Sequence, residues 1–428
     1  MQEQFLHYIW QFQYFDKREL KTTQGEPIEI IHQGIANGNA GPDFLNTKVR
    51  IGKIDWAGNI EIHTKASAWY DHGHDVDAAY ANVVLHVVWA NDKPVFREDG
   101  TPMPTLELGG RVDQSLIGRY KKLVENPGTI PCEKTFVEVS DLVKFSMLDK
   151  ALMQRLEQKA GQVLQLAKAN VNDWEEITYQ VIGRNFGFKI NYEPFFQLVN
   201  AVERKVLLKH SDNLMAMEAI LFGQAGFLDF GMKDEYFKTL QREYQVLSSK
   251  YGLAHYKLNQ AMWRFLRLRP ANFPTIRIAQ FSALYFNHNN LFAKLMEAGS
   301  ENHLRALFAV SPSAYWHGHY RFGRAAVGSI SKMGKESVDN LIINSVAPLL
   351  VAYGKFSDDQ VLIDRAVSFL QRVPAEKNKI TRLWSGLGLY PRSAFDSQAL
   401  TELYNNFCAK RRCLACNIGV EILKPSKP

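Results

Sequence analysis

Two carboxylates and two basic side chains near the N-terminus have the types and spacing of a metal site. Glu61, His63 and Lys65 alternate within the stretch 54–65, so in a β-strand they project from one face. Asp43 precedes another alternating stretch, and a hairpin of the two strands would bring its carboxylate beside Glu61. Two convergent carboxylates with open positions suit Mg²⁺ or Mn²⁺, because these cations take oxygen ligands and retain water. The pattern predicts a divalent-metal site able to activate water for hydrolysis.

Histidines gather in the same part of the sequence, where four of the chain's twelve fall between residues 63 and 86. His72 and His74 could coordinate a softer metal such as Zn²⁺, or orient the ligands of another ion. His86 lies inside an almost wholly apolar run, 82–89, and we expect it to be a core histidine hydrogen-bonded to a neighbour. The sequence leaves open whether His72 and His74 bind metal.

Three of the four cysteines lie close together near the C-terminus, at Cys408, Cys413 and Cys416. Thiolates at this spacing can bind Zn²⁺ or an iron–sulfur cluster, and either needs a fourth ligand. Cys132 could provide it if the C-terminal segment folds back on the segment around residue 132. The basic residues 410–412 would then balance thiolate charge or contact phosphate. The alternative is four unligated buried thiols that pack as small hydrophobic groups.

The elements that must position these groups belong to two different regions. Apolar residues recur at helical spacing over 3–15, and strand patterns follow at 28–33, 44–51, 54–65, 82–89 and 104–108, with a helical or mixed stretch at 66–81. From about Asp141 the apolar pattern is helical almost to the end. We therefore expect an α+β protein. Its parts would be a small mixed α/β module over 1–110, a linker over 111–140 and a helical domain over 141–428 that carries the cysteine cluster.

Arginines alternate with aromatic residues in the helical region, at Arg264, Arg267 and Arg269, and Arg277 follows nearby. Arginines that contact phosphates, beside aromatic rings that stack on bases, are typical of nucleic-acid binding. The alternative is an amphipathic helix with an apolar core face and a solvated arginine face.

The charge of the chain is unevenly distributed. Residues 1–110 hold 9 Lys and Arg against 15 Asp and Glu, a net charge of −6, while residues 111–428 hold 42 against 29, a net charge of +13. A basic body beside an acidic module suits a polyanionic partner such as nucleic acid, although a sequence pI of about 9.0 can also mean only solubility. No signal peptide or membrane-spanning apolar run is evident, and cysteines are few, so we expect a cytoplasmic protein without a membrane partner.

The N-terminal module resembles the PD-(D/E)XK nuclease superfamily, which has the restriction-endonuclease-like fold. The resemblance covers about residues 3–108 and rests on the order helix, three strands, helix, strand, with Pro42-Asp43 and Glu61 matching the first two motif elements. The sequence departs from the motif at His63, where the family has lysine. Glu3 matches the place where some of these nucleases carry an additional acid on the first helix.

The resemblance implies a Mg²⁺- or Mn²⁺-dependent nuclease in which Asp43 and Glu61 hold the metal. His63 could then act as a ligand or base, or Lys65 on the same face could supply the missing cation. Two alternatives remain open. The module could be an inactive nuclease-like part kept for nucleic-acid binding or assembly, or the chain could hydrolyse another substrate with Zn²⁺ held by His63, His72 and His74.

Two further resemblances extend beyond the module. The cysteine pattern is similar to that of some helicase-associated and CRISPR-associated nucleases of the superfamily, where one cysteine joins three C-terminal ones on a [4Fe–4S] cluster; here the single cysteine follows the nuclease core instead of preceding it. The whole chain resembles an uncharacterised bacterial family of unknown function through the stretches GPDFLNTKV, GNIEIH, NVVLHVVW, EAILFGQAGFL, RPANFPTIRIAQ and CLACNIG.

Overall fold

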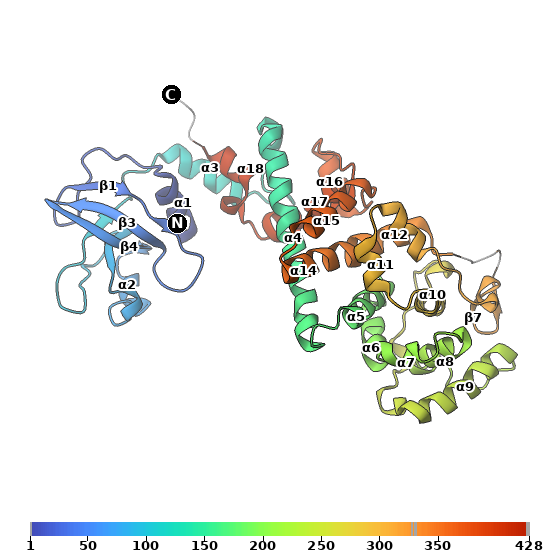
Figure 1. Ribbon diagram of the computed structural model, residues 1–428. Coiled ribbons are helices and arrows are strands. Elements are labelled where there is room, and N and C mark those ends of the chain that lie inside the picture. The colour runs from blue at the N-terminus through green and yellow to red at the C-terminus, as the bar shows by residue number, and fades with distance from the viewer. Residues whose placement is uncertain (1, 327, 329–331, 425–428) are drawn as a thin grey trace. The chain divides into compact units, whose positions relative to one another are not determined.

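The computed structural model describes residues 2–326, 328 and 332–424, which form two compact units (Figure 1). The first unit combines the chain up to Met147 with the segment from Leu403 onward, and the second is Leu148–Glu402. The chain is mixed α+β, with a sheet near the N-terminus and a mostly helical remainder. In the described part of the chain, no helix is both long enough and apolar enough to cross a membrane.

A six-stranded mixed sheet forms the centre of the first unit. The strands are β1 (Ile28–His32), β2 (Ile35–Ala36), β3 (Phe44–Ile51), β4 (Ile54–Lys65), β5 (Val83–Ala90) and β6 (Thr105–Glu107). Their order is β1-β3-β4-β5-β6, with β2 paired to β3. β3 and β4 form an antiparallel hairpin, whereas β4, β5 and β6 run parallel to one another.

The sequence explains why β4 and β5 occupy the middle of this sheet. In β5, Val83 to Val88 are all buried, including His86, as expected of a strand covered on both faces. The hairpin turns at Gly52, whose φ of 60° favours glycine. Gly58 lets β4 approach β5 closely, because a Cβ there would lie 2.5 Å from the carbonyl oxygen of Asn82.

Helices cover the sheet and connect its parallel strands. Helix α1 (Glu3–Phe12) packs against β4 with Phe5, Leu6 and Ile9 buried. The parallel crossover from β4 to β5 holds the short helix α2 (Ala68–Asp71) and the 3₁₀ turn η1 (Ala78–Tyr80). The stretch expected to be helical or mixed is therefore the short crossover that carries His72 and His74.

The C-terminal segment belongs to the same unit as the sheet. It contains the π-helical turn η8 (Leu403–Cys408), the 3₁₀ turn η9 (Cys413–Ala415) and helix α18 (Asn417–Leu423). Helix α18 packs on α3 (Gln114–Val124), which Asp113 caps by accepting a hydrogen bond from the Ser115 N–H at 2.8 Å. The residues expected to form a linker thus contain α3 and the turn η2 (Phe136–Glu138).

The second unit is built from helices, with one small hairpin. The long helix α4 (Asp141–Ala169) leads into it. The helices that follow are α5 (Trp174–Phe186), α6 (Tyr192–Ala201), α7 (Arg204–Leu208), α8 (Leu214–Gln224), α9 (Glu235–Tyr251), α10 (Pro274–Asn287), α11 (Leu291–Glu297), α12 (Glu301–Phe308), α13 (Lys335–Leu341), α14 (Ala347–Ser357), α15 (Gln360–Arg372), α16 (Lys379–Gly386) and α17 (Ala394–Glu402). Shorter turns are η3 (Leu253–Tyr256), η4 (Gln260–Met262), η5 (Pro270–Asn272), η6 (Ala314–His317) and η7 (Ile342–Val346), and the hairpin is β7 (His319–Arg321) with β8 (Arg324–Ala325).

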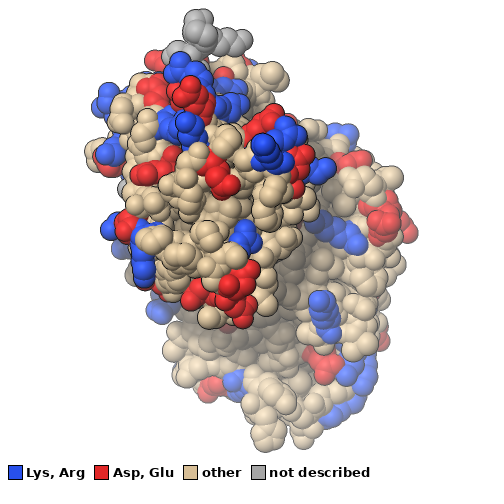
Figure 2. All heavy atoms as spheres, turned by 90° about the vertical axis from the view of Figure 1, so that its left-hand side faces the viewer, with Lys and Arg blue, Asp and Glu red and all other residues tan. Residues whose placement is uncertain are grey.

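Charged side chains of both signs are interspersed over the face of the molecule seen in Figure 2. Exposed ion pairs of the first unit, such as that of Arg50 with Glu29 and Asp55 on neighbouring strands, contribute to this mixture. Pairs of this kind contribute little to stability because water screens them.

Candidate metal centre

The β3–β4 hairpin brings Asp43 and Glu61 together. Phe44 pairs with Ile60, so Asp43 lies at the mouth of β3 directly beside Glu61. The Asp43 N–H donates to Glu61 Oε2 at 3.2 Å, and the Ile62 N–H donates to Asp43 Oδ2 at 2.9 Å. Two carboxylates eighteen residues apart in sequence therefore meet where β3 begins, beside the interior strand β4.

Glu61 is buried in a setting that disfavours its negative charge. The residue is 5% exposed, and burial together with the nearby charge of Asp43 raises the pKa of its carboxyl to about 9. Hydrogen bonding from the Asp43 backbone opposes this shift but does not cancel it. A buried carboxyl of this kind is ionised at neutral pH only when a cation lies beside it.

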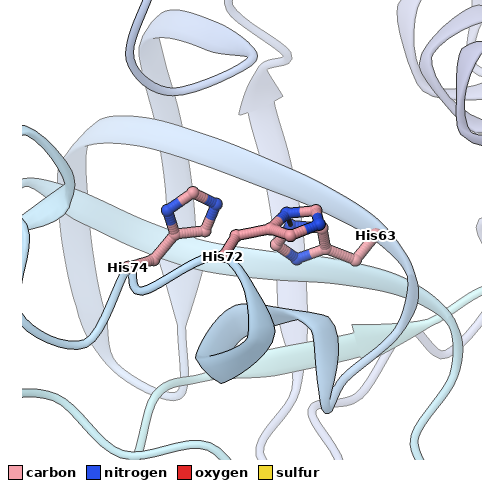
Figure 3. Close-up of side chains that lie close together, drawn as sticks. All are labelled: His63, His72 and His74. Carbon is pink, nitrogen blue, oxygen red and sulfur yellow. Dashed lines mark hydrogen bonds between the residues drawn. The ribbon is translucent and has the colours of Figure 1, made fainter.

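Three imidazoles meet at the same place as these carboxylates. One ring nitrogen of each of His63, His72 and His74 lies within 4.8 Å of the other two, and Figure 3 shows the three rings gathered beside the sheet. His74 Nε2 is 3.3 Å from Glu61 Oε1, and His63 Nε2 is 3.5 Å from the same oxygen. Glu61 therefore links the carboxylates to the imidazoles in a single cluster.

The imidazole of His86, which is buried in the interior of the unit, contacts His63. His63 Nδ1 lies 2.9 Å from His86 Nε2 on β5, and His63 Nε2 lies 3.2 Å from His72 Nδ1. Burial lowers the pKa of His63 to about 2 and that of His86 to about 3, so both rings are neutral at physiological pH. Neutral imidazole is the form that binds metal. His86 is thus a core histidine hydrogen-bonded to a neighbour, and that neighbour is His63 of the cluster.

Helix α1 contributes two further residues to the cluster, His7 and Glu3. His7 Nε2 lies 3.3 Å from Asp43 Oδ2. Burial, opposed by His7 but aided by Asp43, raises the pKa of Glu3, so this carboxyl also belongs to the cluster. Sequence reasoning found Glu3 and missed His7. The available signal was their separation of four residues, which places both on one face of a helix.

The chemistry of these groups fits a divalent cation. Neither ring nitrogen of His74 makes a hydrogen bond of good geometry, although Nε2 lies 3.3 Å from Glu61 Oε1, and the His74 side chain is only 8% exposed. An ion bound by one of these nitrogens would remove the cost of leaving that buried polar atom unpaired. Oxygen ligands from Asp43 and Glu61 with nitrogen ligands from the imidazoles suit Mn²⁺ or Zn²⁺ better than Mg²⁺, which prefers oxygen.

A cavity adjoins the cluster on the side of His74. Its volume is about 350 Å³, and its lining includes Trp69, His74, Asp75, Asp77, Tyr80 and Arg97. The Tyr80 ring stacks on His74 with centroids 3.7 Å apart. His72 is exposed at the cluster, so a substrate can reach the imidazoles from solvent.

Lys65 has a different environment from the buried groups of β4. It is exposed at the end of the strand. The pKa of Asp92 is lowered by a hydrogen bond from the Ser67 backbone and also by the charge of Lys65, which places this ammonium near Asp92. Lys65 is thus exposed, whereas Glu61 and His63 on the same strand are buried.

The four arginines of the helical unit that suggested nucleic-acid binding differ in accessibility. Arg264, Arg267 and Arg269 are exposed between η4 and η5. Arg277 on α10 is 3% exposed, donates to Gln280, Asn272 and Ser337, and lies over the Phe188 ring at 4.6 Å. The guanidinium is hydrogen-bonded to other residues of the protein. A side chain buried in this way is not placed to contact phosphate, contrary to the expectation for Arg277.

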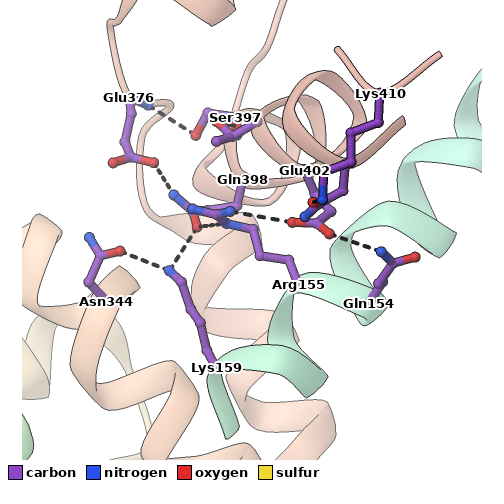
Figure 4. Close-up of polar contacts among 11 residues, drawn as sticks. Gln154, Arg155, Lys159, Asn344, Glu376, Ser397, Gln398, Glu402 and Lys410 are labelled. Carbon is purple, nitrogen blue, oxygen red and sulfur yellow. Dashed lines mark hydrogen bonds and ion pairs between the residues drawn. The ribbon is translucent and has the colours of Figure 1, made fainter. Parts of the chain in front are cut away.

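A second buried polar cluster joins helices of the second unit (Figure 4). Lys159 on α4 donates to Asn344 at 2.8 Å and to Gln398 at 3.0 Å, and Arg155 pairs with Glu402 at 3.4 Å. Burial lowers the pKa of Lys159 to about 7. Donors and acceptors are matched within the protein, so this cluster holds α4 to α17.

A family model described as "Protein of unknown function (DUF2851)" matches residues 3–379. The chain belongs to this family. The matched region includes every residue of the candidate metal site but ends before the cysteines at 408, 413 and 416. No curated protein and no solved structure matches the chain.

Proposed function

We propose that this DUF2851 protein is a divalent-metal-dependent hydrolase that cleaves phosphodiester bonds of nucleic acid. The observation that carries the proposal is the meeting of Asp43 with Glu61 at the hairpin, where His74 and His63 approach the same Glu61 oxygen. Carboxylates and neutral imidazoles at one point are a ligand set for a catalytic metal.

The topology around the cluster supports a restriction-endonuclease-like module. A hairpin, β3–β4, is followed by a crossover to the parallel strand β5, and α1 covers β4. In the PD-(D/E)XK pattern the two acids lie on such a hairpin, as Asp43 and Glu61 do here. Glu3 on α1 adds the helical acid. His63 stands at the position of the usual lysine. The role of that lysine, assisting the attacking water, is assigned here to His72.

In the proposed mechanism, Asp43, Glu61 and His74 would hold the ion. A divalent ion bound there would polarise the phosphodiester and lower the pKa of a bound water. His72 is exposed and would accept a proton from the attacking water at its Nε2, because its Nδ1 lies 3.2 Å from His63 Nε2. His63 is a positioning residue, because its two ring nitrogens face His86 and His72.

Charge in the rest of the chain supports a polyanionic substrate. Residues 111–428 carry a net charge of +13, and Arg264, Arg267 and Arg269 are exposed. Each arginine that neutralises a phosphate releases counterions, so binding through these residues weakens as salt increases. Arg277 is not part of the proposed surface because it is buried.

One observation favours a second function, a Zn²⁺-dependent hydrolase of a substrate other than nucleic acid. The cavity beside His74 is lined by Asp75, Asp77, Glu98 and Asp99 with only Arg97 as a counter-charge. Such a lining disfavours a polyanion and suits a small neutral or cationic substrate. The three close imidazoles would then hold Zn²⁺.

The test is incubation of the purified full chain with DNA and with RNA in Mn²⁺, Mg²⁺, Zn²⁺ or EDTA. The double variant Asp43→Asn/Glu61→Gln is compared with a matched double variant, Glu29→Gln/Asp55→Asn, whose acids are exposed on the same sheet. We expect metal-dependent cleavage by the wild type and the matched variant, and a loss of at least about 100-fold in the site variant.

Other outcomes separate the alternatives. Equal cleavage by the site variant would overturn the assignment of the active site. Binding of nucleic acid without cleavage in any metal would identify an inactive nucleic-acid-binding protein. Zn²⁺-dependent turnover of small ester or amide substrates, without nuclease activity, would identify the second function.

A further inference from the structure

All four cysteines of the chain line one pocket in the first unit. Cys132 lies in the turn after α3, Cys408 ends η8, Cys413 begins η9, and Cys416 directly precedes α18. Each is buried, with exposures between 6% and 9%. The segment around residue 132 and the C-terminal segment are distant in sequence, so the fold itself has brought the four thiols together.

The thiols lie near enough to influence one another electrostatically. Burial, together with the charge of Cys416, raises the pKa of Cys132 to about 12 and that of Cys413 to about 11. The pKa of Cys408 is raised by burial and then by charges on the other three cysteines. Four buried thiols that share one pocket would be held as thiolates only by a metal, which deprotonates a coordinating thiol.

A half-buried arginine close to the cysteines, Arg411, distinguishes this cluster from ordinary apolar packing. Arg411 Nη2 donates to the Gly128 carbonyl oxygen at 3.0 Å, while its Nη1 is buried without a hydrogen-bond partner. The positive charge of Arg411 opposes the effects of burial on Cys408 and Cys413. The unpaired buried Nη1 of Arg411 is unfavourable beside four neutral thiols, whereas thiolates nearby would stabilise its charge.

The backbone around the cysteines is closely fixed. The Cys416 N–H donates to the Cys413 carbonyl oxygen at 3.2 Å, which closes the turn between them. A Cβ on Gly419 would lie 2.2 Å from that same oxygen, so α18 can pack on the turn only with glycine there. Arg411 adopts the left-handed region with φ 53°, an unfavourable conformation that the surrounding contacts maintain.

We propose that Cys132, Cys408, Cys413 and Cys416 bind a [4Fe–4S] cluster as thiolates. The four thiols release their protons, and each sulfur coordinates one iron of the cluster core. The four negative charges of the ligands exceed the positive charge of an oxidised core, so the site is anionic overall. Arg411, whose positive charge acts on Cys408 and Cys413, partly neutralises this charge.

The spacing of the sulfurs favours a cluster over a single zinc ion. Tetrahedral Zn²⁺ with Zn–S bonds of about 2.3 Å requires sulfurs about 3.8 Å apart. Within residues 2–326, 328 and 332–424, the three imidazoles form the one set of three or more ligand atoms that all lie within 4.8 Å of one another. No three of the four sulfurs therefore lie within 4.8 Å of one another, which is wider than a single zinc ion with four thiolate ligands requires.

The test uses full-length protein purified without oxygen. We expect about four irons and four sulfides per chain and a broad absorbance band near about 400 nm that dithionite bleaches. Cys413→Ser/Cys416→Ser should lower the iron content at least about ten-fold, whereas the control Ala415→Ser, in the same turn, should retain iron. One zinc per chain without iron and sulfide, or metal-free protein with four freely reactive thiols, would overturn the proposal.

A second measurement covers the case in which the cysteine variant fails to fold. In the wild type, oxidative removal of the iron with ferricyanide and EDTA should free thiols for titration and expose the segment after Leu403 to limited proteolysis. Unchanged thiol reactivity after this treatment would count against the cluster. Asp43→Asn/Glu61→Gln should keep its iron, so failure of the proposed hydrolase and failure of the cluster are distinguishable.

Discussion

Replacing Glu61 by glutamine should stabilise the metal-free protein and abolish its stabilisation by metal. The carboxyl has an ordinary pKa of 4.5 and a pKa of about 9 when buried beside Asp43. Between these values the folded state keeps a proton that the unfolded state releases. Stability therefore falls as pH rises through this window, and glutamine, which cannot ionise, does not incur this loss.

The size of the effect follows from the difference in pKa. At pH 7 the carboxyl of the unfolded chain is about 2.5 units above its pKa, which at about 1.4 kcal/mol per unit gives an upper limit of about 3.5 kcal/mol. Glu61→Gln should gain up to this amount in unfolding free energy at pH 7 and almost nothing at pH 4.5. The amide oxygen can still accept from the Asp43 N–H, so this hydrogen bond is retained.

The assay is urea unfolding of EDTA-treated protein at pH 4.5, 6 and 7, with and without Mn²⁺ or Zn²⁺. The matched control is Glu107→Gln, whose side chain is exposed on β6. Metal at about 100 times its dissociation constant should stabilise the wild type and the control by about 2.7 kcal/mol and leave Glu61→Gln unchanged. A pH-independent destabilisation of metal-free Glu61→Gln, or equal stabilisation of that variant by metal, would refute the reasoning.

Three further substitutions test neighbouring parts of the structure. His86→Leu removes the ring that faces His63, and we expect metal affinity in calorimetry to fall about 10- to 100-fold; an unchanged affinity would show that His63 needs no such support. Arg277→Ala should lower the unfolding free energy by about 2 kcal/mol or more, because it leaves buried partners unpaired, while nucleic-acid affinity measured by fluorescence anisotropy should stay the same. Gly419→Ala should displace Cys413 and reduce the absorbance near about 400 nm per chain; full retention of the band would contradict the packing described.

Local patterns were sufficient to predict the hairpin and its acids. The strands expected at 44–51 and 54–65 have those limits in the structure, and the pairing of Phe44 with Ile60 places Asp43 beside Glu61 as a hairpin requires. Alternation correctly placed Glu61 and His63 on one face of β4. It could not show that this face is buried too, because burial depends on α1 and the crossover after β4.

Tertiary contacts account for what the sequence did not reveal. His7 is an unremarkable residue of an amphipathic helix until α1 packs on the sheet and brings it to Asp43. Arg277 follows the exposed arginines by only eight residues, and the packing of α10 buries it. The sequence predicted that Cys132 meets the C-terminal cysteines only if the C-terminal segment folds back on the segment around residue 132. Local patterns do not show whether a chain folds back, because this depends on tertiary contacts.

Anomalous diffraction from crystals soaked in Mn²⁺ tests the central claim most directly. The account predicts a peak at the Asp43–Glu61 cluster with carboxylate oxygens and His74 at ligand distances of about 2.0–2.6 Å. The same peak should be absent from crystals of Asp43→Asn/Glu61→Gln. A fully ordered site in the wild type with no anomalous density, or a peak that persists unchanged in the variant, would contradict it.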